Sequence, residues 1–345
     1  MTEIQAVRWD KETLVLLDQT KLPGEEVDFV AHTVDEVVDA VNRLVVRGAP
    51  ALGAVGAFGV VVALDQGVRE SWTAEQLSQQ ILRVRNARPT AVNLAWGVDR
   101  VQPFAAQGRD EVLTQAHQIV VEDTAANRKL SELGADWILQ RTGASKLRVL
   151  THCNTGALAT TGWGTALGVI RELHERGALE VVYVDETRPL LQGARLTAWE
   201  LEREGIDYRV QADGAAASTI LRGLVDFAII GADRIARNGD SANKIGSVGV
   251  ALACQAAGIP FMVAAPSSTV DLDTASGEEI EIELRDGAEV TELAGVSIAP
   301  VGAQGFNPAF DVTPAKYISA IVTEKCVVEP KDSPDVSALV HGGSK

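Results

Sequence analysis

Cysteine is scarce in this chain. Its 345 residues include three cysteines, Cys153, Cys254 and Cys326, which lie far apart in the sequence. Disulfide frameworks normally use an even number of cysteines, and no pair here has the spacing of metal ligands. We therefore expect three free thiols and a reducing, cytoplasmic location.

Two kinds of hydrophobic segment are also missing. The residues Met1 to Asp10 contain neither the basic nor the apolar stretch of a signal peptide, so export is not predicted. The longest apolar run, Ala49 to Leu64, is rich in glycine and alanine and falls short of the roughly 20 residues that cross a bilayer. It predicts a buried helix instead.

Basic residues are outnumbered. The chain has 31 lysines and arginines against 47 aspartates and glutamates, a formal charge of −16. Such a charge repels polyanions and argues against a general role at nucleic acid or at an anionic membrane. A small phosphorylated substrate remains compatible, because a few local Arg, Lys and backbone N–H groups are enough to bind it.

The chain does have ample core material, since 46% of its residues are hydrophobic. Up to about residue 145 the apolar residues recur mainly at helical spacing, which predicts a mainly helical N-terminal domain. Its opening segment, Val7 to Leu22, has apolar runs on both sides of Asp10-Lys-Glu12 and predicts a short hairpin. Helices are expected over residues 35–46, 50–64, 73–86, 91–104 and 110–140.

From residue 146 to residue 330, strands and helices alternate. This order predicts an α/β fold with a parallel sheet and helices on both of its faces. The polar residues 331–345 predict a flexible tail. The expected strands are 148–151, 180–184, 208–210, 225–230 and 260–264, and the expected helices are 164–176, 194–204, 215–221 and 247–257.

A thiol and a carboxyl group end two of these strands. Cys153 follows the strand 148–151 and enters a glycine-containing turn, where backbone N–H groups can stabilise a thiolate. The alternative is a small buried side chain, the role we expect for Cys254. Asp233 follows the strand 225–230, where it is placed for acid–base chemistry or, alternatively, for capping a helix.

Other loops carry groups that suit an anion. Asn243 and Lys244 precede a glycine-rich helix start, where a lysine and helix N-terminal amides can hold a phosphate. Arg47 and Gly48 open another helix, and the glycine lets the backbone approach a ligand. For each, a solvated or turn residue is the alternative, as it is for Arg88 and Gln192. His152 is expected to face away from Cys153 and to be structural.

One glycine pattern does not predict a dinucleotide site. Gly162-Trp-Gly-Thr-Ala-Leu-Gly168 resembles the nucleotide-binding fingerprint, and Asp185 follows at a suitable distance. In that fingerprint the first glycine directly follows the strand, whereas here the strand ends near Thr151.

Taken together, the segments resemble the methylthioribose-1-phosphate isomerase family. Its wider superfamily includes isomerases of ribose 1,5-bisphosphate and 5-deoxyribose 1-phosphate, and regulatory subunits of the eukaryotic translation-initiation nucleotide-exchange factor. The matching motifs run in order along nearly the whole chain: residues 14–23, Arg47-Gly-Ala-Pro-Ala-Leu-Gly53, Arg88-Pro-Thr-Ala-Val-Asn-Leu94, Thr151-His-Cys-Asn-Thr-Gly156, residues 186–195, Gly231-Ala-Asp-Arg234, Asn243-Lys-Ile-Gly246 and residues 307–314.

The resemblance implies a small helical N-terminal domain on a Rossmann-like C-terminal domain, a homodimer, and no metal or organic cofactor. It implies that 5-methylthioribose 1-phosphate is isomerised to 5-methylthioribulose 1-phosphate in methionine salvage. A related sugar phosphate, or a regulatory binding subunit, is the alternative. The implied catalytic pair is Cys153 and Asp233, and the implied substrate-binding residues are Arg47, Gly48, Ala49, Arg88, Gln192, Asn243 and Lys244.

The chain departs from the family's pattern in two places. The segment Ile280-Glu-Ile-Glu-Leu-Arg285 lacks a proline and one acid that the family commonly has, and Thr155 replaces an alanine. The first departure is expected to alter a neighbouring loop or a subunit contact.

Overall fold

The computed structural model describes residues 4–89, 92–333 and 335–342, which form two compact units. Unit 1 comprises Met1–Ala126 and Gly156–Gly164, and unit 2 comprises Asn127–Thr155 and Thr165–Lys345. The long helix α5 (Arg109–Thr142) contributes to both units. The domain boundary predicted near residue 145 falls between α5 and the next strand, and it stays a prediction.

Unit 1 begins with a small antiparallel sheet. Strands β1 (Val7–Asp10) and β2 (Thr13–Leu17) form the expected hairpin, with Lys11 and Glu12 at positive φ in its turn. A third strand, β3 (Asp28–Ala31), pairs with β2 and was not predicted. Burial alternates along β3, with Asp28 and Val30 exposed and Ala31 buried, but the three apolar residues are consecutive, so the sequence itself does not alternate.

The helices of unit 1 are close to those predicted. They are α1 (Val34–Asn42), α2 (Ala49–Glu70), α3 (Ala74–Arg85), α4 (Val92–Val101) and the 3-10 turn η1 (Gln102–Gln107). Capping boxes at Thr33 and Thr73 start α1 and α3. The predicted start of α4 at Ala91, and Thr90 of the Arg88 motif, lie outside the described residues.

Helix α2 is the core of unit 1. It is longer than predicted because its polar last turn, from Asp65 onward, continues the helix. At 22 residues it is long and apolar enough to span a membrane by length and composition, but 78% of its most apolar window is buried within the protein. That burial is typical of the central helix of a folded domain.

Unit 2 is built on a seven-stranded sheet in the order β16-β15-β10-β7-β4-β5-β6. All of its pairings are parallel except that of the edge strand β16 with β15. The strands are β4 (Leu147–Thr151), β5 (Leu179–Asp185), β6 (Tyr208–Gln211), β7 (Phe227–Ile230), β10 (Phe261–Ala264), β15 (Ala320–Val322) and β16 (Val327–Val328). The predicted parallel sheet is confirmed.

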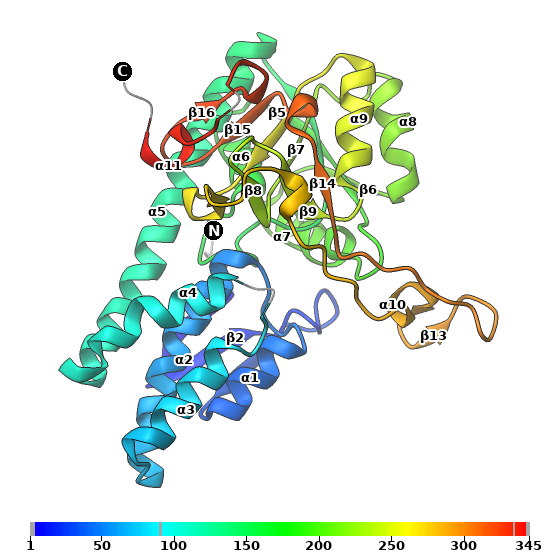
Figure 1. Ribbon diagram of the computed structural model, residues 1–345. Coiled ribbons are helices and arrows are strands. Elements are labelled where there is room, and N and C mark those ends of the chain that lie inside the picture. Colours follow the sequence, from blue (N-terminus) through cyan, green and yellow to red (C-terminus); the bar gives the residue numbers. More distant parts are fainter. Residues whose placement is uncertain (1–3, 90–91, 334, 343–345) are drawn as a thin grey trace. The chain divides into compact units, whose positions relative to one another are not determined.

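Each face of this sheet has its own hydrophobic core. Phe227 and Ile229 of β7 point to the face covered by α5, α6 (Ala166–Glu175) and α7 (Ala198–Glu204). Ala228 and Ile230, the alternate residues, point to the face covered by α8 (Ala216–Leu221) and α9 (Ser247–Ala257). Figure 1 shows α8 and α9 side by side on that face. Helices therefore cover both faces, as predicted.

A second sheet in unit 2 was not predicted. It has the order β11-β8-β9-β14 and joins segments that are distant in the sequence. Its strands are β8 (Arg234–Ala236), β9 (Ser241–Lys244), β11 (Val270–Asp271) and β14 (Phe310–Thr313), and short turns η4 (Ser267–Thr269), η5 (Gly277–Glu279) and η6 (Ala315–Tyr317) lie near them in the chain.

An extension carries α10 (Ala288–Thr291), β12 (Glu292–Leu293) and β13 (Val296–Ser297), and it projects from the rest of unit 2 (Figure 1). The departure from the family pattern lies at its base. There Arg285 pairs with Glu283 and Glu289, and Leu284, at the place of a family acid, is 69% exposed. Because Leu284 cannot form an ion pair, the salt bridges at the base of the extension are formed by Glu283, Arg285 and Glu289.

Part of the segment expected as a flexible tail is packed onto unit 2. Val336 and Leu339 are fully buried, and Leu339 belongs to helix α11 (Ala338–His341), which follows the turn η7 (Pro330–Asp332). The hydroxyl of Thr323 donates to the carbonyl of Leu339. These two apolar side chains belong to the hydrophobic core beside α9. The polar composition of residues 331–345, on which the prediction of a flexible tail depended, does not reveal this packing. Residues 334 and 343–345 lie outside the described part of the tail.

Candidate active site

The strand order of unit 2 reverses at β4. From β4 the chain proceeds to β5 and β6 on one side, and then returns to place β7 on the other side. At such a switch point the loops after neighbouring strands diverge and leave a crevice at the carboxyl ends, which is where open α/β sheets bind ligands. Cys153 follows β4 and Asp233 follows β7, so both predicted catalytic residues are at this edge.

The backbone of Cys153 is held on both sides by the loop after β5. Its N–H donates to Thr187 Oγ1 at 2.8 Å, and its carbonyl accepts from Thr197 Oγ1 at 2.6 Å. Cys153 has a φ of +64°, a left-handed conformation that a non-glycine residue adopts at a cost of about 1–3 kcal/mol. The surrounding hydrogen bonds therefore impose a specific conformation on this cysteine.

Cys254 differs from Cys153 in its surroundings. All three cysteines are free, as predicted. Cys254 is fully buried in α9, and burial raises its pKa to about 12. A thiol with that pKa stays protonated and unreactive at neutral pH, which agrees with the structural role expected for Cys254.

Asp233 leads into a strand and not into a helix. It is exposed, and its N–H donates to the carbonyl of Ala242 at 2.8 Å. The alternative role as a helix cap is therefore wrong. Because β8 pairs with β9, Asp233 lies beside the strand that carries Asn243 and Lys244. Thr155, the second departure from the family pattern, packs against Gly231, where an added Cβ would come within 2.3 Å of its methyl group.

Asn243 and Lys244 are held by hydrogen bonds within the small sheet and its turn. Asn243 is 2% exposed and donates through Nδ2 to Ser247 Oγ at 3.0 Å. Lys244 Nζ donates to the carbonyl of Ala309 at 2.9 Å and lies 4.6 Å from the centre of the Phe310 ring. Both side chains therefore have defined positions at the end of β9.

The helix amides beside Lys244 already have a partner. The N–H groups of Gly246 and Val248, at the start of α9, donate to the carboxylate of Asp311 on β14. Burial raises the pKa of Asp311, and these two amides oppose that rise. We therefore correct the expectation that these amides bind a phosphate, because a carboxylate of the chain itself occupies them.

Gln192 has an unusual buried oxygen. It follows β5 and precedes the π-helical turn η2 (Gly193–Thr197), and it is 5% exposed. Its Oε1 is buried and has no hydrogen-bond partner among the described residues. Buried polar atoms in proteins nearly always have a partner, so an orphaned amide oxygen at this edge indicates a place for a donor from a ligand.

The remaining predicted residues belong to unit 1. Arg47, Gly48 and Ala49 are at the start of α2, and Arg88 is half-buried after α3. Gly48 has a φ of +100°, and an added Cβ would lie 2.2 Å from the carbonyl oxygen of Ala159. Contact with the segment Gly156–Gly164 thus explains this glycine, and the close approach of a ligand is not needed to explain it.

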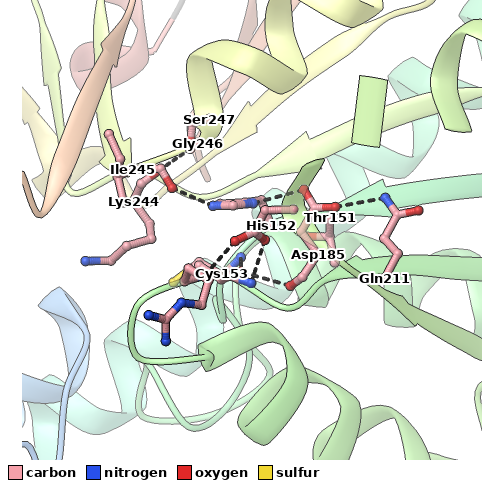
Figure 2. A network of polar contacts seen from close by, with 12 residues as sticks. Thr151, His152, Cys153, Asp185, Gln211, Lys244, Ile245, Gly246 and Ser247 are labelled. Carbon is pink, nitrogen blue, oxygen red and sulfur yellow. Dashed lines mark hydrogen bonds and ion pairs between the residues drawn. The ribbon is translucent and has the colours of Figure 1, made fainter. Parts of the chain in front are cut away.

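A buried polar network that was not predicted lies beside Cys153 (Figure 2). His152 Nδ1 lies 3.0 Å from Asp185 Oδ2, and His152 Nε2 lies 2.8 Å from the carbonyl oxygen of Ile245. Asp185 Oδ1 accepts from Gln211 at 2.8 Å. The signal in the sequence was a polar residue at the end of each of two neighbouring strands, β4 and β5.

His152, Asp185 and Asp213 offer ligand atoms within 4.8 Å of one another, a grouping that suits a metal ion. Their atoms already have partners within the protein. Both oxygens of Asp185 are hydrogen-bonded, and Asp213 accepts from the N–H groups of Thr187 and Arg188 at 2.7 and 2.6 Å. The arrangement is that of a hydrogen-bond network which fixes the loop after β5.

Comparison with known proteins decides the family. Residues 45–330 match the model of the initiation factor 2 subunit family. The chain belongs to this family. Within it, the chain is 47% identical to a methylthioribose-1-phosphate isomerase of Alkalilimnicola ehrlichii over 98% of both proteins. The family predicted from the sequence motifs is confirmed.

A second relative is longer. The chain is 51% identical, over 94% of its own length, to a protein of Nocardia farcinica named a probable bifunctional methylthioribose-1-phosphate isomerase/methylthioribulose-1-phosphate dehydratase. It spans 59% of that relative. The rest of that relative lies outside the alignment with this chain.

Solved structures of the family share the fold. The 5-methylthioribose 1-phosphate isomerase of Pyrococcus horikoshii has a TM-score of 0.88 and 37% identity, covering 99% of this chain and 97% of that one. The translation initiation factor eIF-2B subunit delta of A. fulgidus has a TM-score of 0.86 and 38% identity, covering 98% and 99%. Fold similarity by itself therefore does not separate the two activities named in the family.

Proposed function

We propose that this chain is a methylthioribose-1-phosphate isomerase, which converts 5-methylthioribose 1-phosphate to 5-methylthioribulose 1-phosphate. The observation that carries the proposal is the placement of Cys153 and Asp233 after the neighbouring parallel strands β4 and β7. A thiol and a carboxyl group at one switch-point crevice supply the two proton-transfer groups that an aldose–ketose isomerisation uses. The identity of 47% to an isomerase over nearly the full length supports the same conclusion.

The substrate dictates the steps. Phosphate blocks the anomeric oxygen, so the ring opens by cleavage of the bond between C1 and the ring oxygen, and that oxygen gains a proton. One hydrogen moves from C2 to C1, and the 2-hydroxyl loses its proton to become the ketone. Asp233 carries out the proton transfer at oxygen, and Cys153 acts at carbon. The hydrogen moves either as a hydride, with Cys153 shielding it, or as a proton through an enolate, with Cys153 as base.

The sugar phosphate needs cationic and polar partners. From unit 2 we assign Gln192, Asn243 and Lys244 to its binding, and from unit 1 Arg47, Gly48, Ala49 and Arg88. The orphaned oxygen of Gln192 supports its inclusion, since a sugar hydroxyl would supply the missing donor. The amine of Lys244 and the sulfur of Cys153 extend to the side of the network opposite Gln211 (Figure 2), which supports a common site for anion and thiol.

The first test is an isomerase assay with purified protein and three substrates: 5-methylthioribose 1-phosphate, 5-deoxyribose 1-phosphate and ribose 1,5-bisphosphate. We expect the first to give the highest kcat/KM. Cys153→Ser and Asp233→Asn should each lower kcat by at least about 100-fold, the usual range for a group that transfers protons. Cys254→Ser is the matched control, and it should retain wild-type kcat. A chain inactive on all three substrates would instead favour the regulatory-subunit alternative.

Deuterium at C2 of the substrate separates the two routes. Loss of the label to solvent would refute the hydride shift, and full retention of the label at C1 of the product would exclude an enolate that exchanges with solvent. Either result leaves Asp233 at oxygen, so the experiment addresses the role of Cys153 alone.

We further propose that the protein is a homodimer of the cytoplasm. The free thiols support a reducing compartment, and the dimer is an expectation from the family resemblance. Light scattering after size-exclusion chromatography measures the mass directly, and a value near the 36.6 kDa of one chain would overturn the dimer.

A further inference from the structure

His152 is almost completely buried and uses both ring nitrogens. It is 1% exposed, and it follows β4, next to Cys153. One nitrogen faces Asp185, at the end of β5, and the other faces the backbone carbonyl of Ile245, just after β9. The imidazole therefore links the seven-stranded sheet to the connection between β9 and α9, which contains Gly246 and directly follows Asn243 and Lys244 of β9.

The partners determine which atoms carry protons. A backbone carbonyl can only accept, so Nε2 of His152 bears a hydrogen. Asp185 Oδ1 accepts from the amide of Gln211, whose own oxygen accepts from the hydroxyl of Thr219 at 2.7 Å. His152 Nδ1 and Asp185 Oδ2 lie 3.0 Å apart, and two acceptor atoms do not approach so closely without a hydrogen between them. A second proton therefore lies between these two atoms. The pair thus holds one proton more than a neutral histidine beside a carboxylate.

The groups around the ring favour positive charge. Three carboxyl groups face His152: Asp185 on β5, Asp213 in η3 (Asp213–Ala215) and Asp311 on β14. Burial alone would lower the pKa of His152, but the hydrogen bond and charge of Asp185, with the Ile245 carbonyl and Asp213, outweigh burial and raise it. Lys244, which precedes Ile245 in the chain, donates through Nζ to the Ala309 carbonyl.

The shape of the turn matches the ring. Gly246 has a φ of +110°, and an added Cβ would lie 2.8 Å from Cε1 of His152. Only glycine leaves space for the imidazole here, and the N–H of Gly246 donates to Asp311 at 2.8 Å. The turn is therefore held by His152 on one side and by β14 on the other.

We propose that His152 is a positioning residue, whose doubly protonated ring fixes the turn after β9 and thereby places Asn243 and Lys244 relative to Cys153. The inference rests on the proposed function, because it takes Asn243 and Lys244 as substrate-binding residues. It assigns to His152 a role in substrate affinity, where the sequence had predicted a structural residue.

The first experiment tests the protonation without using activity. Nitrogen NMR of the full chain with labelled histidine, assigned by comparison with His152→Gln, reports both ring nitrogens. In a pH titration we expect the doubly protonated ring to become neutral only above the ordinary histidine pKa of about 6.5, and a transition below that value overturns the proposal. This result is independent of substrate, so it stands apart from any failure of the isomerase assay.

The second experiment separates positioning from folding. In His152→Gln, an amide donor can still reach Ile245 but the charge is lost. KM should rise about 10-fold, the order expected for losing one charge-assisted hydrogen bond, while kcat falls less. His174→Gln, the same substitution on α6, should leave both constants unchanged. A His152→Gln protein with wild-type KM and a native circular dichroism spectrum overturns the proposal.

The pH profile provides a further check. Because the folded-state pKa of His152 is raised, the link is complete below the ordinary histidine value of about 6.5 and is lost as pH rises through the folded-state pKa. KM of the wild type should therefore increase on the alkaline side, and this increase should be absent in His152→Gln. Identical alkaline profiles of KM in the two proteins contradict the proposal.

Discussion

Thr187 Oγ1 accepts a hydrogen bond from the backbone N–H of Cys153 and donates one to the carbonyl of Asp185, with distances of 2.8 and 2.9 Å. One hydroxyl thus joins the loop after β5 to the turn after β4. Both loops leave the sheet at the switch point, so this hydroxyl sets where the thiol lies with respect to the strand that supplies Asp185.

Replacing that hydroxyl should impair catalysis. Thr187→Val keeps the shape of the side chain but removes both hydrogen bonds, and it leaves a buried N–H without a partner at a cost of about 1–3 kcal/mol. We expect kcat to fall about 10-fold or more, since small displacements of reacting groups are costly. Thr187→Ser, which keeps the hydroxyl, should retain most of the activity. Equal kcat values for the Val and Ser proteins would show that the hydroxyl has no such role.

Gln192 offers a prediction in which affinity and stability change in opposite directions. Because its Oε1 is buried without a described partner, Gln192→Leu should leave the stability of the free protein unchanged or higher. The same change should raise KM about 10-fold if a substrate hydroxyl is the missing donor. Thermal unfolding and steady-state kinetics measure the two effects.

Gln211 is the matched control for that experiment. Its oxygen and its nitrogen both have partners, Thr219 and Asp185. Gln211→Leu should therefore lower the melting temperature, in contrast to Gln192→Leu. The interpretation of Gln192 fails if its Leu variant melts lower while KM stays at the wild-type value.

The local pattern of the sequence predicted those parts of unit 2 that depend on short segments. Helix α9 has the predicted bounds, and β4, β7 and β10 lie within one or two residues of the expected strands. Apolar alternation and helical periodicity are properties of such segments, and they carry this information. The position of Cys153 and of Asp233 at strand ends follows from the same segments.

Features that depend on pairing between distant segments were missed. β9 pairs with β14, so that Asn243 lies opposite Asp311, and nothing in the four residues of either strand specifies that partner. To predict the contact of His152 with Asp185, one must know that β4 and β5 are neighbours in the sheet. To predict that the N–H groups at the start of α9 donate to Asp311, one must know the second sheet. Strand order, which is a property of the whole chain, decided these contacts.

Gly48 tests the packing of unit 1. An alanine there would combine an unfavourable φ with a Cβ placed 2.2 Å from the Ala159 carbonyl. Gly48→Ala should destabilise the protein by more than the about 1–3 kcal/mol that strained backbone alone costs. Gly108 has a similar φ of +107° and open space around it, so Gly108→Ala isolates the strain. Chemical denaturation should give a clearly larger loss for Gly48→Ala, and equal losses would contradict the packing argument.

Acid stability is expected to depend on an ion pair at the start of β4. The side chain of Arg148 makes two hydrogen bonds to Asp226, at 2.6 and 3.0 Å, and its backbone N–H makes a third at 2.7 Å. Burial by itself raises the pKa of Asp226, but these contacts outweigh it and lower the pKa. A depressed folded-state pKa stabilises the protein above the unfolded-state value of about 3.9, and that stabilisation is lost as pH falls through the folded-state pKa.

Asp226→Asn should therefore be less stable than wild type at pH 7, by about 1–3 kcal/mol for hydrogen bonds to a charged group. The difference should shrink as the pH is lowered below about 4, because protonation weakens the wild-type pair as well. Urea denaturation between pH 7 and pH 3.5 measures it. Glu132→Gln, in an exposed pair with Lys129, is the control and should change stability by less than about 1 kcal/mol at any pH. A stability difference between wild type and Asp226→Asn that stays constant with pH would mean that the charge of this carboxylate contributes nothing, and that shape alone accounts for its place beside Arg148.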